Sequence, residues 1–180
     1  HDSIYLGEDG PTHQPVEHLM SLRLIPNVDV IRPSNSIEIE HSYRYAFSDS
    51  KNPKVLSLTR QDIDYLDFDI KYEDFVKGGY AVSDGEDFTI VASGSELEIA
   101  FKIKEALLEY SVRIVSVPIL NRISKMKNED KKALLKNERI FSIELGRSIG
   151  WEHYLGSLTK SFSIETFGES APIIDLQKNF

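Results

Sequence analysis

The 180-residue sequence has no cysteine, one tryptophan and two methionines. Without cysteine there is no disulfide framework, no thiolate metal ligand and no thiol nucleophile, which is compatible with a reducing cytosol. No apolar run approaches the roughly 20 residues needed to span a bilayer, and the polar, acidic amino end does not resemble a signal peptide. We therefore expect a soluble, cytoplasmic protein without a membrane partner.

Positive charge is also scarce, because 21 lysines and arginines face 29 aspartates and glutamates for a formal net charge of -8. Nucleic acids and anionic membranes reward a basic stripe, which is absent, so neither is expected as the main partner. Any bound phosphate must rely on local positive charge. The length suits one large domain or two small ones.

The first 19 residues gather acids, glycines and histidines into a loop that leads into a helical turn. A glycine-proline bend, Gly10-Pro11-Thr12, separates Asp9 from His13 and can bring a carboxylate and an imidazole to one concave face. From the spacing alone, two interpretations stay open. Asp9 stabilises its own turn while His13 caps the next helix, or the two side chains meet a ligand. Because residue 1 already lies inside this segment, we expect a fragment or a partly observed chain.

Strand and helix patterns then alternate, which favours a parallel sheet covered on both faces. We predict a helix over 15–24, a buried strand over 28–31, a helix that begins near residue 36 and ends before residue 48, and a strand over 54–59. On the second helix, the expected apolar face comprises Ile39, Tyr43, Ala46 and Phe47. Ligands gather beyond the carboxyl ends of parallel strands. Arg60 follows such an end and could hold either a phosphate or a protein carboxylate.

Between residues 61 and 80, acids interleave with aromatic residues and two glycines close the segment. We interpret it as a linker across the surface, because its acids lack the calcium-loop pattern that a metal site would show. A second α/β unit follows, with strands over 88–92, 112–117, 139–144 and 162–166. Ser95 and Glu98 predict a capping box for a helix that runs to residue 110, and a short helix is expected over 125–136.

Several motifs together resemble the transketolase family. They are the run from His1-Asp2-Ser3 through Gly10-Pro11-Thr12-His13-Gln14 to Leu19, Arg32-Pro33, Leu58-Thr59-Arg60-Gln61 and Lys77-Gly78-Gly79-Tyr80. The resemblance implies an α/β fold in which a partial parallel sheet with flanking helices precedes a small three-layer α/β/α domain. Residues 1–68 would be the carboxyl-terminal half of the thiamine diphosphate pyrimidine-binding domain, 69–78 a linker and 79–180 the carboxyl-terminal domain. Tyr5 departs from the pattern, which usually has a small residue there.

The resemblance also implies a reaction, in which a two-carbon ketol unit passes from a ketose phosphate to an aldose phosphate in the pentose phosphate pathway. The nucleophile is the cofactor thiamine diphosphate, held with a divalent cation, Mg or Ca. His13 would be the catalytic residue beside the thiamine ring. Asp9 would recognise a sugar hydroxyl, while Arg60 and His1 would hold the phosphate.

The Gly-Asp-Gly motif and the glutamate that serve the cofactor in this family are not found in the sequence. We therefore expect no cofactor-binding or metal-binding residue in this chain, and no activity from the chain alone. The native-length protein should be a homodimer that binds sugar phosphates. Two alternatives remain, a dihydroxyacetone synthase that uses formaldehyde as acceptor and a noncatalytic module for subunit assembly. The sequence before His1 would separate the module from the enzyme.

Overall fold

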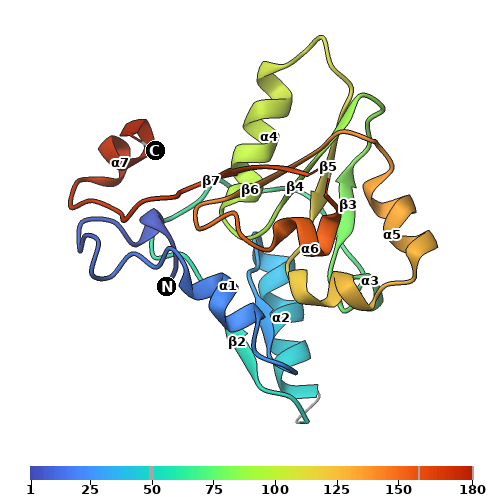
Figure 1. Cartoon of the computed structure of the whole chain (residues 1–180), viewed down its shortest axis with the longest axis horizontal. Helices are drawn as coiled ribbons and strands as arrows, with labels where there is room; N and C mark the ends of the chain where they lie inside the picture. Colours follow the sequence, from blue (N-terminus) through green and yellow to red (C-terminus); the bar gives the residue numbers. More distant parts are fainter. Residues whose placement is uncertain (49–50, 158, 180) are drawn as a thin grey trace.

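In the computed structural model, residues 1–48, 51–157 and 159–179 are described. The amino-terminal part contains a 3-10 turn, two helices and a two-stranded sheet, shown in blue to cyan in Figure 1. In chain order these elements are η1 (Ile4–Leu6), α1 (His18–Arg23), β1 (Asp29–Ile31), α2 (Ser36–Ser48) and β2 (Lys54–Leu56).

Strands β1 and β2 pair in parallel, as predicted, with Val30 opposite Val55. Strand β2 ends at Leu56, three residues before the predicted end. Beyond it the Leu58 carbonyl accepts a hydrogen bond from the Asp2 backbone N–H at 3.1 Å, so the chain turns its hydrogen bonding toward the amino end. This contact places the first residues beside the carboxyl ends of both strands.

The predicted apolar face of α2 is wrong, because Ile39, Tyr43 and Phe47 are exposed. The buried side of the helix is polar and includes Glu38 and Tyr45. The Glu38 carboxylate accepts hydrogen bonds from Ser34 and Ser116, and the Tyr45 hydroxyl donates to Asp29 at 2.5 Å. The apolar periodicity therefore predicted the wrong face of the helix. Polar side chains can be buried on the other face because they find hydrogen-bond partners there.

The second unit is a five-stranded sheet in the order β3-β5-β4-β6-β7. Its strands are β3 (Tyr80–Ser83), β4 (Phe88–Ala92), β5 (Val112–Ser116), β6 (Ile140–Glu144) and β7 (Lys160–Ser163). Strand β3 was not predicted, and it pairs antiparallel to β5 at the sheet edge, whereas the other neighbours pair in parallel. Strand β7 begins and ends earlier than the predicted strand over 162–166.

Helices cover both faces of this sheet, which confirms the three-layer α/β/α arrangement (Figure 1). Alternate residues of β4 divide between two cores, Ile90 packing with α4 (Glu96–Ala106) and Val91 with α5 (Asn128–Leu135) and α6 (Trp151–Leu155). A 3-10 helix, η2 (Leu120–Lys125), joins the second core. The short α3 (Tyr72–Phe75) lies in the segment predicted to be a linker.

The predicted capping box at the start of α4 is wrong. The Ser95 hydroxyl makes no cap hydrogen bond and donates instead to Glu96 Oε2 at 2.8 Å. The Glu98 carboxylate accepts from the Asp64 backbone N–H at 2.9 Å and from Lys102, so it joins the linker to the helix rather than capping it. The helix ends at Ala106, before the predicted Tyr110.

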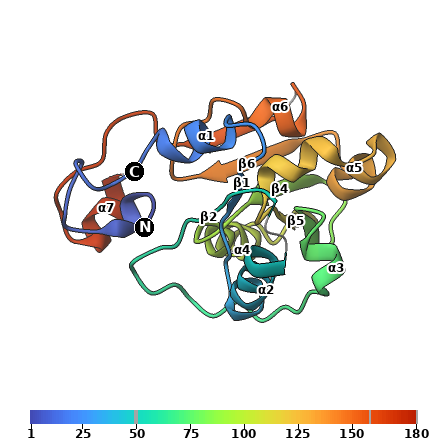
Figure 2. The ribbon, with the colours of Figure 1, turned by 90° about the horizontal axis from the view of Figure 1, so that it is seen from below.

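A last helix, α7 (Ile173–Asn179), was not predicted. Figures 1 and 2 both show it beside the amino-terminal loop, although the two segments come from opposite ends of the chain. Leu176 of α7 is buried in one apolar cluster with Ile4, Tyr5 and Val16. The carboxyl end therefore supports the loop that the sequence singled out for chemistry. Over the described residues, no helix is long and apolar enough to cross a membrane.

Candidate functional site

His1 and His13 line the same pocket, which has a volume of about 340 Å³. It lies between the amino-terminal loop, α1 and the carboxyl end of β2, where Leu56 and Ser57 complete its wall. Both histidines are exposed, and His13 Nδ1 lies 2.9 Å from the Thr12 hydroxyl. With His18 of α1, which also lines the pocket, three histidines thus border one cavity at the end of the parallel strands.

Asp9 and Arg60 form an ion pair on the same loop surface. Their side chains are 43% and 51% exposed, respectively, so the guanidinium keeps a large solvent-facing area. Neither residue lines the pocket of the two histidines. The four predicted site residues therefore form two pairs, linked through the short loop that carries both Asp9 and His13.

Two glycines shape this loop. Gly7 and Gly10 have φ angles of +89° and +80°, which side-chain-bearing residues rarely adopt. The Gly10 carbonyl accepts hydrogen bonds from the backbone N–H groups of His13 at 3.0 Å and Gln14 at 3.1 Å. The predicted bend therefore forms, and it fixes the short path from Asp9 to His13.

Sequence reasoning missed a buried ionic cluster directly behind the site. Arg32 follows β1, is fully buried and donates to Asp2 at 2.7 Å, Glu96 at 3.0 Å and Glu144 at 3.1 Å. Glu144 also accepts from Arg23 at 2.8 Å. The pattern gave a weak signal at most, because Arg32 stands alone after a strand and its partners lie far along the sequence.

The three carboxylates of the cluster have pKa values that are shifted in different directions. Burial would raise the pKa of Asp2, but Arg32 and hydrogen bonds hold it below the usual range. Burial likewise opposes the charge on Glu144, yet Arg23 and Arg32 lower its pKa. For Glu96, burial prevails over the attraction of Arg32, and the pKa is raised. With every side chain enclosed, the cluster joins the two sheets and leaves no charge for a ligand.

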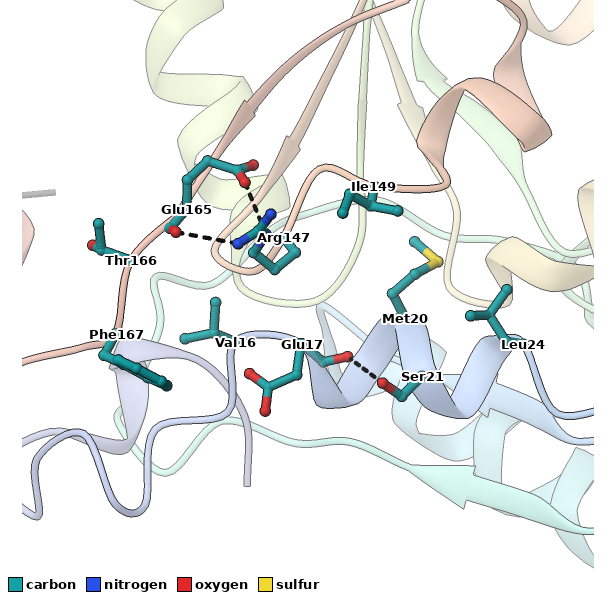
Figure 3. A pocket seen from close by; sticks show the side chains of 10 residues that line it. All are labelled: Val16, Glu17, Met20, Ser21, Leu24, Arg147, Ile149, Glu165, Thr166 and Phe167. Carbon is teal, nitrogen blue, oxygen red and sulfur yellow. Dashed lines mark hydrogen bonds and ion pairs between the residues drawn. The ribbon is translucent and has the colours of Figure 1, made fainter.

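A second cavity of about 430 Å³ lies between α1 and two loops of the carboxyl-terminal unit (Figure 3). Its wall is largely apolar, with Met20, Leu24 and Phe167. Its polar pair is already engaged, since Arg147 Nε lies 2.8 Å from Glu165 Oε2. Hydrogen bonds from Ser148 and Ser163 hold the pKa of Glu165 at about 2. We assign no chemistry to this cavity.

The described residues contain no group of three or more histidine, aspartate or glutamate side chains that could hold a metal ion. This holds for the acidic segment over 61–80 as well. The described residues alone therefore do not supply a complete set of side-chain ligands for a divalent cation.

Comparisons with known proteins match both parts of the chain. The family "Transketolase, pyrimidine binding domain" matches residues 1–64, and "Transketolase-like TK C-terminal domain" matches residues 78–180. A chloroplastic transketolase of Zea mays is 40% identical over 100% of this chain and 28% of its own length. The chain thus spans about 28% of that relative.

Solved structures show the same likeness. Transketolase from Leishmania mexicana superposes with a TM-score of 0.91 at 39% identity, covering 99% of this chain and 27% of that protein. A Pichia stipitis transketolase in complex with sedoheptulose 7-phosphate gives a TM-score of 0.90 at 36% identity, with the same two coverages of 99% and 27%.

Proposed function

The chain belongs to the transketolase family, and on that premise we propose that the whole protein transfers a two-carbon ketol unit from a ketose phosphate to an aldose phosphate. The observation that carries this proposal is the match of two transketolase domains in succession, over residues 1–64 and 78–180. The reaction would serve the pentose phosphate pathway. The comparisons do not favour the formaldehyde-using synthase or the assembly module, since the matched relatives are named transketolases.

In this proposal Arg60 and His1 hold the phosphate of the sugar. Support for Arg60 comes from its exposure of 51%, because a planar, permanently charged guanidinium with free surface suits a phosphate monoester. His1 is exposed in the pocket wall and can donate a further hydrogen bond. Local charge of this kind is required, given the overall charge of -8.

Asp9 would accept a hydrogen bond from a sugar hydroxyl, and its pairing with Arg60 fixes the direction of its carboxylate. His13 would be the catalytic residue of this chain, exchanging a proton with a substrate hydroxyl. Its supporting features are exposure to the pocket and an Nδ1 that the Thr12 hydroxyl orients, which leaves Nε2 for the ligand. The assignment gives each loop side chain a separate task.

Transketolases in general use thiamine diphosphate and a divalent cation. We infer that the whole protein holds both mainly with residues outside these 180, because the chain spans about 28% of the length of the Zea mays relative. We further propose a cytoplasmic homodimer in which residues 1–68 complete the pyrimidine-binding domain, 69–78 act as a linker and 79–180 form the carboxyl-terminal domain. The chain alone is then expected to be inactive.

A coupled assay of the native-length protein tests the proposed reaction. With thiamine diphosphate and magnesium, we expect sedoheptulose 7-phosphate to form from xylulose 5-phosphate and ribose 5-phosphate. A parallel assay replaces ribose 5-phosphate with formaldehyde. Product only in the second assay would support the synthase instead, and product in neither would reject ketol transfer.

A further inference from the structure

Gln14 is a buried polar residue at the end of the loop that carries Asp9 and His13. Its side chain is only 3% exposed, although it lies between an exposed histidine and the start of α1. Buried amide protons need acceptors, because an unpaired donor away from water is destabilising. The partners of Gln14 show what it connects.

Both protons of the Gln14 amide are used. Nε2 donates to the Gly7 carbonyl at 2.7 Å, within the loop, and to the Glu169 carbonyl at 3.0 Å, in the carboxyl-terminal unit. One side chain therefore closes the loop on itself and ties it to a segment 155 residues further along.

The segment over 168–170 approaches the loop so closely that larger residues would collide with it. A Cβ atom added to Gly168 would lie 1.6 Å from Gln14 Oε1, and one added to Gly10 would lie 2.0 Å from the Ser170 hydroxyl. The two segments thus interlock at two points of the loop, Gly10 between Asp9 and His13, and Gln14 directly after His13. A side chain at either glycine would force its neighbour to move, and the φ of +80° at Gly10 independently favours glycine.

We propose that Gln14 is a positioning residue, through which the segment over 168–170 sets the places of Asp9 and His13 for substrate. The expected change in KM rests on the proposed function. The contact of Gln14 with the segment over 168–170 does not. It assigns the carboxyl-terminal domain a part in substrate recognition. Displacement of a reacting group by about 1 Å can cost about a hundredfold in rate, so this support has a large expected effect.

The test uses the native-length protein with Gln14→Met, which keeps the length of the side chain and removes both donors. The matched control is Gln177→Met, because Gln177 Nε2 donates to the Tyr5 hydroxyl at 3.0 Å and also joins the carboxyl end to the amino-terminal segment. The control removes a comparable contact that does not reach the loop over 7–14.

Two readouts are taken at a temperature where each variant is folded. In Gln14→Met we expect amide hydrogen exchange over residues 7–14 to accelerate about tenfold or more, as local opening becomes easier. We also expect kcat/KM to fall about a hundredfold, with KM raised. A loss of folded protein alone would leave KM unchanged. Gln177→Met should stay within about twofold of the wild type in both.

A second variant approaches the same contact from the other side. Gly168→Ala leaves Gln14 intact but pushes against its Oε1 atom, and it should reproduce the faster exchange and the raised KM. If Gln14→Met and Gly168→Ala match the wild type in exchange and KM, the proposal is wrong. If both variants fail to fold, the contact is structural and positioning is rejected as well.

The outcomes also separate this inference from the proposed reaction. A wild-type protein without ketol transfer, but with faster exchange in both variants, would reject the reaction and retain the connection. An active wild type whose variants keep normal exchange and KM would retain the reaction and reject the positioning role of Gln14.

Discussion

Two arginines stand near the carboxyl ends of neighbouring strands, yet their surroundings differ completely. Arg32, after β1, is fully buried and contacts the carboxylates of Asp2, Glu96 and Glu144. Arg60, beyond β2, is 51% exposed and pairs with Asp9 on the surface. The same side chain at the same kind of position thus joins domains in one case and remains open to a ligand in the other.

The difference shows that position at a strand end does not by itself indicate a binding residue. What separates the two arginines is the supply of carboxylates from other segments. Glu96 of α4 and Glu144 of β6, both from the carboxyl-terminal unit, enclose Arg32, whereas Arg60 pairs with Asp9 of the amino-terminal loop and stays 51% exposed. A guanidinium that keeps exposed donors can exchange a weak surface partner for a phosphate.

The largest effect should follow from removing the buried arginine. In the native-length protein, Arg32→Met leaves three buried carboxylates without their shared cation, and we expect the free energy of unfolding to fall by about 3 to 5 kcal/mol. Denaturant melts measure the change. The control is Arg44→Met, at an exposed arginine whose guanidinium lies over the Tyr72 ring, and it should stay within about 1 kcal/mol. Equal losses in the two variants would erase the contrast between buried and exposed arginines.

The second-largest effect should come from acid, which weakens the buried cluster. Asp2 and Glu144 have lowered pKa values in the folded state, so their stabilisation is present above the usual carboxylate range and is lost as pH falls through the folded values. The raised pKa of Glu96 acts in the opposite direction and offsets part of the loss. The stability difference between wild type and Arg32→Met should therefore shrink below about pH 4. Melts from pH 7 to 3 that show a constant difference would contradict this.

A smaller effect is expected from Arg60→Lys, which keeps the positive charge and removes the planar fork. The KM for a phosphorylated donor should rise about tenfold or less, because a point charge replaces paired donors. Steady-state kinetics measure KM, and thermal melts of the same samples serve as the control. An unchanged KM would mean that the fork has no part in phosphate binding.

The smallest effect should come from the surface pair itself. Asp9→Asn removes one charge of an exposed ion pair, so the free energy of unfolding should change by no more than about 1 kcal/mol. Denaturant melts check this value. A loss as large as that of Arg32→Met would show that the surface pair, too, is structural.

The sequence predicted much of the backbone and of the loop. Strands β4, β5 and β6 lie where apolar runs indicated, and the glycine-proline bend forms as expected. These features depend on local composition and on alternation along the chain, which sequence patterns record directly. The side-chain roles proposed for His1, Asp9, His13 and Arg60 remain predictions.

What could not be predicted depends on partners that are distant in sequence. The buried face of α2 is polar because Glu38 reaches Ser116, and Glu98 fails to cap its helix because Asp64 and Lys102 occupy it. Short edge strand β3 and helix α7 have weak local patterns and depend on packing against the rest of the chain. The cluster around Arg32 depends on the same long-range contacts.

The central claim is that Arg60 binds the phosphate of a sugar, whereas Arg32 only joins the domains. The most direct measurement compares KM for a phosphorylated donor, xylulose 5-phosphate, with KM for its unphosphorylated counterpart in wild type and Arg60→Ala. We predict that the substitution raises KM for the phosphorylated donor by about 10-fold to 100-fold and leaves the other unchanged, because only one substrate loses a charge-assisted contact. Equal changes for both donors would contradict the claim.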